Sequence, residues 1–117
     1  MASQKVDLYI DQNSDFYQNV LITDQNLNAV NVTGYSFFGQ IREIPSGTVL
    51  ADFSVSTTSP LTGSLLLEIP ASVTKNIPVT SEFNFYRYDI FMKDGGSSIL
   101  MLFYGDIFVN ESITQIT

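Results

Sequence analysis

Histidine, cysteine and tryptophan are absent from this chain of 117 residues. Without histidine, the chain lacks the side chain that most often acts as a general acid or base near neutral pH. Without cysteine, it can form no disulfide bond, thiolate metal site or thiol nucleophile. A hydrolase would therefore need paired carboxylates or a serine–lysine arrangement. We predict that the protein is not an enzyme and that it binds no cofactor.

Basic residues are also scarce, since five lysines and arginines stand against 12 acidic residues and give a net charge of −7. The five are scattered along the chain, so the sequence predicts neither a nucleic-acid partner nor an anionic membrane surface. The N-terminus lacks the apolar core of a signal peptide, and the most apolar run, residues 99–104, is far too short to span a membrane. We expect a soluble protein without a secretory signal.

The residues that are present favour a folded β protein. Hydrophobic residues make up 44% of the chain and charged residues 15%, which predicts one folded domain over residues 1–117. Apolar and polar residues alternate in short runs between turn signals, which indicates an all-β, antiparallel Ig-like β-sandwich of about seven to eight strands, with a barrel as the alternative. Residues 70–78, which begin and end with proline, predict at most one short helical turn. Residues 1–14 are expected to form an extended arm or edge strand, and residues 111–117 a C-terminal tail.

The first predicted hairpin turns at Pro45-Ser46-Gly47. Pairing outward from this loop gives one apolar face, directed to the core, and one polar face, on which Arg42 lies diagonally across from Asp52 within reach of an ion pair. The predicted pairs are Ile41 with Ala51, Gly39 with Phe53 and Phe37 with Val55 on the core face, and Arg42 with Leu50 and Gln40 with Asp52 on the other.

The second predicted hairpin turns at Asp94-Gly95-Gly96-Ser97, because a Gly-Gly centre is typical of tight hairpin turns. Its reverse face is only half polar, and an exposed apolar patch of this kind usually marks a contact with another protein. The predicted core pairs are Met92 with Ile99, Ile90 with Met101, Tyr88 with Phe103 and Tyr86 with Gly105, and the predicted interface consists of Phe91, Leu100, Leu102 and Tyr104.

Acidic residues offer three candidate pairs for acid–base chemistry: Asp11 with Asp15, Glu43 with Asp52, and Asp89 with Asp106. We favour structural roles for them, with Asp89 meeting Arg87 or solvent. Residues 11–15 match the start of a calcium loop, D-x-N-x-D. Phe16 and Ile22 stand where that loop needs glycine and glutamate, so a polar turn is the preferred interpretation and no metal site is predicted.

Several aromatic residues are not needed for the core. Phe37, Phe53, Tyr88 and Phe103 fall on core faces, where packing is their expected use. The aromatic residues left over as interface candidates are Tyr9, Tyr17, Phe38 and Tyr104. Three of these are tyrosines, which could also stack against sugars.

One ordered series of segments carries a resemblance. It runs from Asp24 through Asn31-Val32-Thr33-Gly34-Tyr35, Gln40-Ile41-Arg42, Gly63-Ser64-Leu65-Leu66-Leu67, a helical turn ending at Pro78, Tyr88-Asp89-Ile90 and Gly105-Asp106-Ile107-Phe108-Val109. Over about residues 15–110 this series resembles a small β-sandwich module of tailed bacteriophages and is similar to the N-terminal domain of phage baseplate upper proteins. The signature residues are Thr33, Gly34, Tyr35, Gln40, Arg42, Asp52 and Gly105.

The resemblance implies a bacteriophage virion structural protein, in the tail or baseplate, that acts by non-catalytic assembly. Its partners would be other virion proteins and further copies of itself in a homo-oligomer or symmetric array, and it would be located in the virion after assembly in the host cytoplasm. A capsid decoration protein is one alternative. A carbohydrate-binding module that uses Tyr9, Tyr17 and Tyr104 is another. Within the motif, Gly34 is expected at positive φ and Tyr35 at the start of a core strand.

Overall fold

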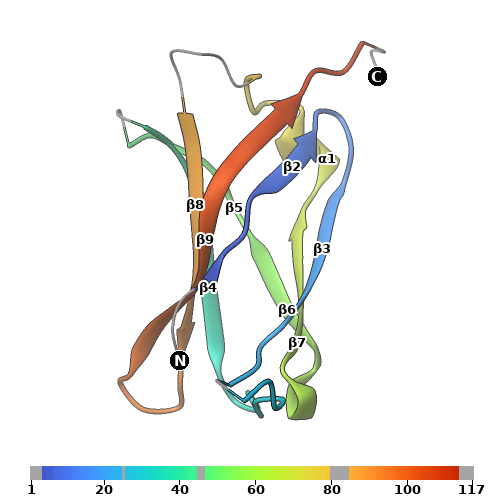
Figure 1. The fold of residues 1–117 in the computed structure, drawn as a ribbon. Helices are drawn as coiled ribbons and strands as arrows, with labels where there is room; N and C mark the ends of the chain where they lie inside the picture. Colours follow the sequence, from blue (N-terminus) through green and yellow to red (C-terminus); the bar gives the residue numbers. More distant parts are fainter. Residues whose placement is uncertain (1–3, 25, 45–46, 80–84, 114–117) are drawn as a thin grey trace.

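The computed structural model describes residues 4–24, 26–44, 47–79 and 85–113. Two sheets pack face to face, which confirms the predicted antiparallel β-sandwich (Figure 1). The described residues form nine strands rather than seven or eight. The strands are β1 (Gln4–Lys5), β2 (Leu8–Asp11), β3 (Phe16–Leu21), β4 (Ser36–Ile44), β5 (Val49–Asp52), β6 (Ser54–Ser59), β7 (Ser64–Ile69), β8 (Phe85–Lys93) and β9 (Ile99–Asn110).

The larger sheet has the order β1-β9-β8-β4-β5, with β2 also on β9, and the smaller sheet has the order β3-β7-β6. β1 and β2 run parallel to β9 at the edge of the larger sheet, with Leu8 opposite Ile107 and Ile10 opposite Val109. The other ladders are antiparallel. The N-terminal segment is therefore part of the sandwich, and its buried Leu8 and Ile10 belong to the core.

Two short helical turns connect strands, where at most one was predicted. α1 (Ala71–Thr74) lies within the predicted segment 70–78. The second is a 3-10 turn, η1 (Pro60–Thr62), between β6 and β7. Pro60 at its start supplies a helical φ, and Gly63 closes it at a φ of 70°. No helix in the described ranges is long and apolar enough to cross a bilayer.

The first hairpin confirms two of the predicted pairs, Ile41 with Ala51 and Gln40 with Asp52. A bulge then places Arg42 opposite Val49 rather than Leu50. The predicted pair of Phe37 with Val55 is wrong, because the chain leaves the larger sheet at Phe53 and continues as β6 of the smaller one. Loop residues 45 and 46 lie outside the described residues.

The second hairpin has the predicted strands but a different register. The Asp94 side chain accepts hydrogen bonds from the backbone N–H groups of Gly96 and Ser98, and the loop extends through Ser98, so that Lys93 pairs with Ile99. A bulge between Ile90 and Phe91 then shifts the register again and places Tyr88 opposite Gly105. The predicted pairs of this hairpin are therefore wrong by one residue near the loop and by two beyond the bulge.

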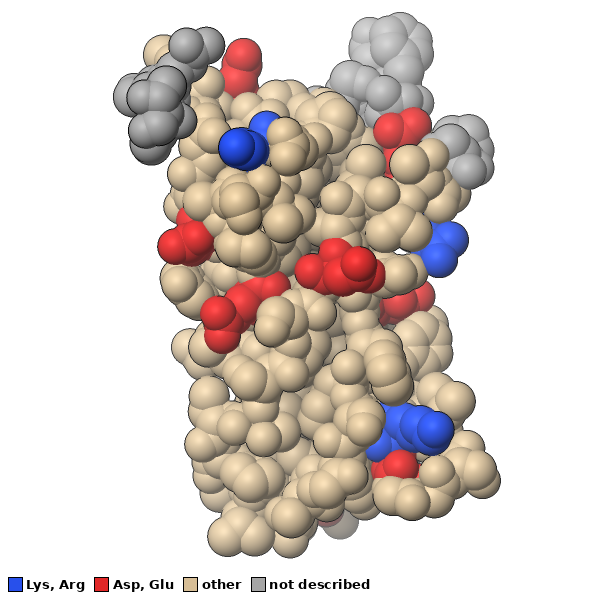
Figure 2. All heavy atoms as spheres, turned by 180° about the vertical axis from the view of Figure 1, so that it is seen from behind, with Lys and Arg blue, Asp and Glu red and all other residues tan. Residues whose placement is uncertain are grey.

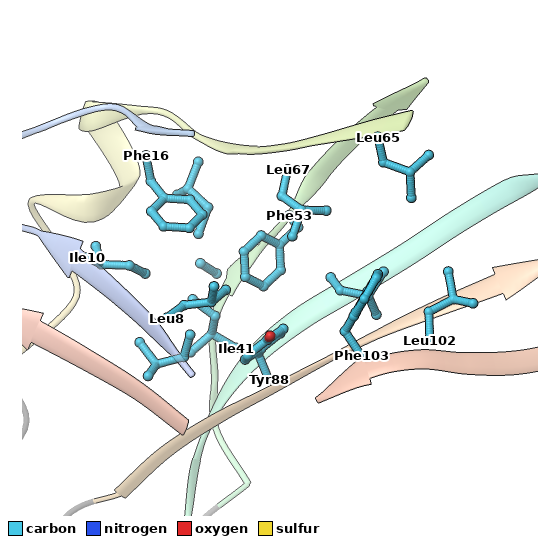
Figure 3. Packing of buried hydrophobic residues seen from close by; sticks show 14 of the residues in the cluster. Leu8, Ile10, Phe16, Ile41, Phe53, Leu65, Leu67, Tyr88, Leu102 and Phe103 are labelled. Atoms are coloured by element: carbon cyan, nitrogen blue, oxygen red, sulfur yellow. The ribbon is translucent and has the colours of Figure 1, made fainter. Parts of the chain in front are cut away.

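Leu102 is buried because it lies at the bulge in β9. This extra residue of β9 turns its side chain between the sheets, where it is 3% exposed (Figure 3). Leu100 pairs with Met92, whose side chain belongs to the core, and it is 43% exposed near the hairpin end. The prediction that Leu102 lies on an exposed outer face is wrong, because a two-residue alternation does not continue through a bulge.

Phe53 marks the middle of the core, where the chain passes from one sheet to the other. Its ring makes an edge contact with Phe16 of the smaller sheet at 6.2 Å between centroids, and a tilted contact with Tyr88 of the larger sheet at 5.6 Å (Figure 3). A Cβ atom at Gly39 would press against Phe53 and overlap Ile90. Glycine at position 39 therefore makes room for the side chains of Ile90 and Phe53.

Candidate interaction surface

The surface of the larger sheet that faces away from the smaller sheet, here called the outer face, carries five rows of described side chains across β4, β8 and β9; the row of Ser36, Lys93 and Ile99 at the hairpin end is followed by four numbered rows. Strand register defines them. The first row is Phe38, Phe91 and Met101; the second is Gln40, Asp89 and Tyr104; the third is Arg42, Arg87 and Asp106; the fourth is Ile44 and Phe85, with Phe108 and Tyr9 paired beside them on β9 and β2.

The first and fourth rows expose large apolar side chains. Phe38 is 56% exposed, Phe85 is 61% exposed and Tyr9 is 66% exposed. Tyr9 and Phe108 stack with their ring centroids 5.2 Å apart. Isolated exposed apolar residues are ordinary, but rows of them on a rigid sheet are typical of protein contact surfaces.

The second and third rows carry the charges. Arg87 Nε donates to Asp106 Oδ1 at 3.2 Å. Arg42 Nη2 donates to Gln40 Oε1 at 2.9 Å, and Gln40 Nε2 donates to Asp52 Oδ1 at 2.9 Å. Arg42 thus reaches Asp52 through Gln40, rather than by the predicted direct ion pair.

Asp89 lies beside these side chains in the middle of the outer face. Burial raises the pKa of its carboxyl group, and the nearby positive charge of Arg42 partly opposes this rise. Asp106, rather than Asp89, is the carboxylate that meets Arg87. An open groove of about 520 Å³ runs between the second and third rows, lined in part by Arg42, Asp89 and Tyr104.

The predicted interface residues divide between the two sides of the sheet. Phe91 and Tyr104 lie on the outer face, whereas Leu102 is in the core and Leu100 pairs with an inward residue. Met101 and Phe108 lie on the outer face although the sequence analysis did not select them. The bulge at Leu102 reverses the alternation on the side of the hairpin loop, so that Met101 lies outward and Leu100 inward, and the two-residue period contains no signal for it.

The predicted signature residues 33–35 form a structural turn. Tyr35 N–H donates to Val32 O at 3.0 Å, and Gly34 has a φ of 80°, which confirms the predicted positive φ. Asn31 Oδ1 accepts hydrogen bonds from both the N–H and the hydroxyl of Thr33. Tyr35 packs against the core one residue before β4 begins.

Gly105, the last signature residue, lies where the N-terminal segment runs beside β9 between β1 and β2. Val6 N–H donates to Tyr104 O at 2.8 Å, and the Tyr88 hydroxyl donates to Val6 O. A Cβ atom at position 105 would overlap the carbonyl group of Val6. The glycine therefore permits the close approach of these two strands.

The acidic loop at residues 11–15 binds other parts of the chain. Asp15 Oδ1 accepts from Ala71 N–H at 2.7 Å at the start of α1, and the Thr74 hydroxyl donates to Ser14 O at 2.8 Å. Asp11 Oδ1 accepts from Asn110 Nδ2 at 2.9 Å. In the described part of the chain, no three acidic residues are grouped as potential metal ligands. These hydrogen bonds hold the loop between β2 and β3 against α1, where the chain passes from the larger sheet to the smaller one.

The other candidate pair and the predicted glycan residues are dispersed. Glu43 lies on the inward-facing side of β4, opposite Tyr86, whereas Asp52 lies on the outer face. Tyr17 is on β3 of the smaller sheet, opposite Glu68, while Tyr9 and Tyr104 are on the larger sheet. The three tyrosines do not share one surface on which a single sugar could stack.

Charge is distributed unevenly over the rest of the surface. Figure 2 shows, on the side opposite to the view of Figure 1, several acidic side chains in a band across the middle and wide uncharged areas.

No protein-family model matches the chain, and no curated protein matches it significantly. The geometry of the outer face is therefore the main guide to function.

Proposed function

We propose that this chain is a structural component of a tailed bacteriophage virion, in the tail or baseplate, that acts by non-catalytic protein–protein assembly. The ordered segments that resemble small phage β-sandwich modules support this proposal. The observation that carries it is the outer face, where two apolar rows flank a charged centre. Other virion proteins and further copies of the chain are the proposed partners, and the virion is the proposed location.

The arrangement of the outer face suits assembly. Stable protein interfaces combine apolar side chains, especially aromatic ones, with polar groups that fix orientation. Phe38, Phe91 and Phe85 project from paired strands, so their positions are set by the sheet. The outward side chains of the smaller sheet around Tyr17 are mainly serine, threonine, asparagine and glutamate, with Leu21 and Leu66 among them. Of the two sheet faces, the outer face of the larger sheet is better suited to contact another protein.

Incorporation into particles tests this proposal. Virions are purified from cells that express the gene in its own genomic context, and the chain is quantified in them by mass spectrometry. We expect the wild-type chain in the particles and a loss of at least about tenfold for Phe38→Ser, because an exposed aromatic contact is removed. Tyr17→Ser is the matched control, since Tyr17 is 59% exposed on the opposite sheet and Phe38 is 56% exposed.

Absence of the wild-type chain from purified particles would contradict the virion proposal. Equal incorporation of the two variants would contradict the role of the outer face. Immunogold labelling then separates the proposed tail or baseplate position from the alternative of a capsid decoration protein, because the label would appear on the head in the second case.

A further inference from the structure

We propose that a second copy of this chain binds the outer face, with the two sheets packed face to face about a twofold axis that runs across the strands between the second and third rows. This inference deepens the proposed function and rests on the use of the outer face in assembly. It adds the identity of the partner and the geometry of the contact.

Along each strand of the outer face, the charge or polarity of the side chain changes between the second and the third row. On β8, Asp89 in the second row is followed by Arg87 in the third, and β9 has Tyr104 and then Asp106 in the same rows. β4 has Gln40 and then Arg42. The N-terminal segment extends both rows, because Lys5 pairs with Tyr104 and Asp7 lies beside Asp106, whose N–H donates to Asp7 Oδ1 at 3.0 Å.

A twofold axis across the strands sets the second row of one copy against the third row of the other, with each strand facing its own counterpart. The resulting pairs on β4, β8, β9 and the N-terminal segment are complementary. Asp89 faces the partner's Arg87, and Lys5 faces the partner's Asp7. The Tyr104 hydroxyl, a hydrogen-bond donor, faces the partner's Asp106, and the Gln40 side chain faces the partner's Arg42.

The same axis brings the apolar rows together at both ends of the contact. The first row of one copy meets the fourth row of the other, so that Phe38 faces the partner's Ile44, Phe91 faces the partner's Phe85, and Met101 faces the partner's Phe108. Apolar side chains between two aligned sheets, about 10 Å apart, are the ordinary content of a sandwich interior. The groove between the second and third rows would receive polar side chains of the partner.

A twofold axis parallel to the strands and centred over β8 is disfavoured by charge. An axis parallel to the strands would set each row against itself. With the axis over β8, Asp89 would then face the partner's Asp89, and Arg87 would face the partner's Arg87. Like charges in an interface lower affinity strongly. The change of charge along β8, from Asp89 to Arg87, therefore favours an arrangement in which the strands of the two copies run in opposite directions over one with a parallel axis over β8.

Reciprocal charge reversal tests the proposal. Sedimentation velocity of the purified chain over a concentration series should show a dimer. Asp89→Lys sets a lysine against the partner's Arg87, and Arg87→Glu sets a glutamate against the partner's Asp89. Each variant alone should weaken self-association by about a hundredfold or more. An equimolar mixture of the two should recover a dimer, because both positions then face an opposite charge.

Controls separate this effect from misfolding. Glu68→Lys reverses a charge on the smaller sheet, where Glu68 pairs with Tyr17, and it should leave the dimer unchanged. Circular dichroism melts should show that all variants fold. A wild-type monomer at every concentration, single variants that still dimerise, or a mixture that stays monomeric would each overturn the proposal.

The outcomes also distinguish this inference from the proposed function. A chain that enters virions but is monomeric in solution contradicts the twofold contact and leaves the virion proposal in place. A chain that dimerises as described but is absent from purified particles supports the twofold contact and contradicts the virion proposal.

Discussion

Gly34 is the residue at which backbone conformation most clearly limits the sequence. Its φ of 80° is rare for residues with side chains, although no atom lies within 4 Å of an added Cβ. Gly34→Val should lower the free energy of unfolding by about 1–3 kcal/mol, because a β-branched residue is strained in this conformation. Chemical denaturation measures the loss. Gly95→Val is the matched control, since position 95 is equally open and its φ is not in the left-handed region; an equal loss there would contradict the explanation.

At position 105 a side chain is excluded by contact with the Val6 carbonyl group, and not by the backbone φ. Gly105→Ala should cost about 1–3 kcal/mol of stability, since the added methyl group overlaps the Val6 carbonyl. The strain should be relieved by displacement of the N-terminal segment. Hydrogen exchange of the Leu8 and Ile10 amides should therefore accelerate more than exchange within β4. Uniform acceleration across both sheets would indicate general destabilisation instead.

At the scale of elements, the bulge in β9 leads to a prediction about two neighbouring leucines. Leu102→Ala should lower stability by about 2–5 kcal/mol, because Leu102 is 3% exposed and its truncation leaves a cavity. Leu100→Ala should cost much less, since Leu100 is 43% exposed. Urea unfolding of both variants measures the difference. Similar losses, or a larger loss at position 100, would contradict the observed register.

Local patterns predicted the elements better than the contacts between them. Alternation found the inward side of β8, where Tyr86, Tyr88, Ile90 and Met92 are all buried. The pairing of Gln40 with Asp52 also followed from the loop. The change of sheet at Phe53 did not follow from the sequence, because one alternating run continues from β5, which belongs to the larger sheet, into β6, which belongs to the smaller one. The parallel pairing of β2 with β9 joins residues far apart in sequence, and no local signal encodes it.

The residues of the outer face were predicted only in part, because local alternation does not reveal a bulge. Phe38, Tyr9 and Tyr104 were recognised as aromatic residues not needed for the core, and all three lie on the outer face. Met101 was missed because its side of β9 depends on the bulge, whereas Phe108 lies beyond the bulge on the side that simple alternation from Tyr104 gives. Leu102 was selected wrongly through the same feature, since one extra residue reverses the alternation on one side of it.

At the scale of the whole molecule, stability should depend on pH through the buried tyrosines. Burial raises the pKa of Tyr88 above its ordinary value of 10.0, and the negative charge of Asp7 adds to the rise. Burial and then Glu43 raise the pKa of Tyr86 as well. The folded state therefore retains these protons when the unfolded chain has lost them. Their contribution to stability is complete below pH 10 and is lost as the pH rises toward the folded-state pKa values.

Tyr88→Phe tests two effects of the Tyr88 hydroxyl on stability: its hydrogen bond to Val6 O near pH 7 and its ionisation above pH 10. The variant should be less stable than wild type near pH 7 by about 1 kcal/mol, because the hydrogen bond to Val6 O is lost. Above pH 10 its stability should fall less steeply than that of wild type. Denaturation at several values between pH 7 and 11 measures both. Parallel curves over this range would show that Tyr88 does not contribute to the alkaline loss.

The parallel pairing of β2 with β9 has a consequence for how the protein is made. Leu8 pairs with Ile107, so about one hundred residues separate the two strands. At ribosomal rates of about 5–20 residues per second, β2 is synthesised some 5–20 s before its neighbour exists. Until β9 has been made, Leu8 and Ile10 lack the strand beside which they are buried. The larger sheet can be completed only after β9 has been translated, so the N-terminal edge of the sandwich forms last.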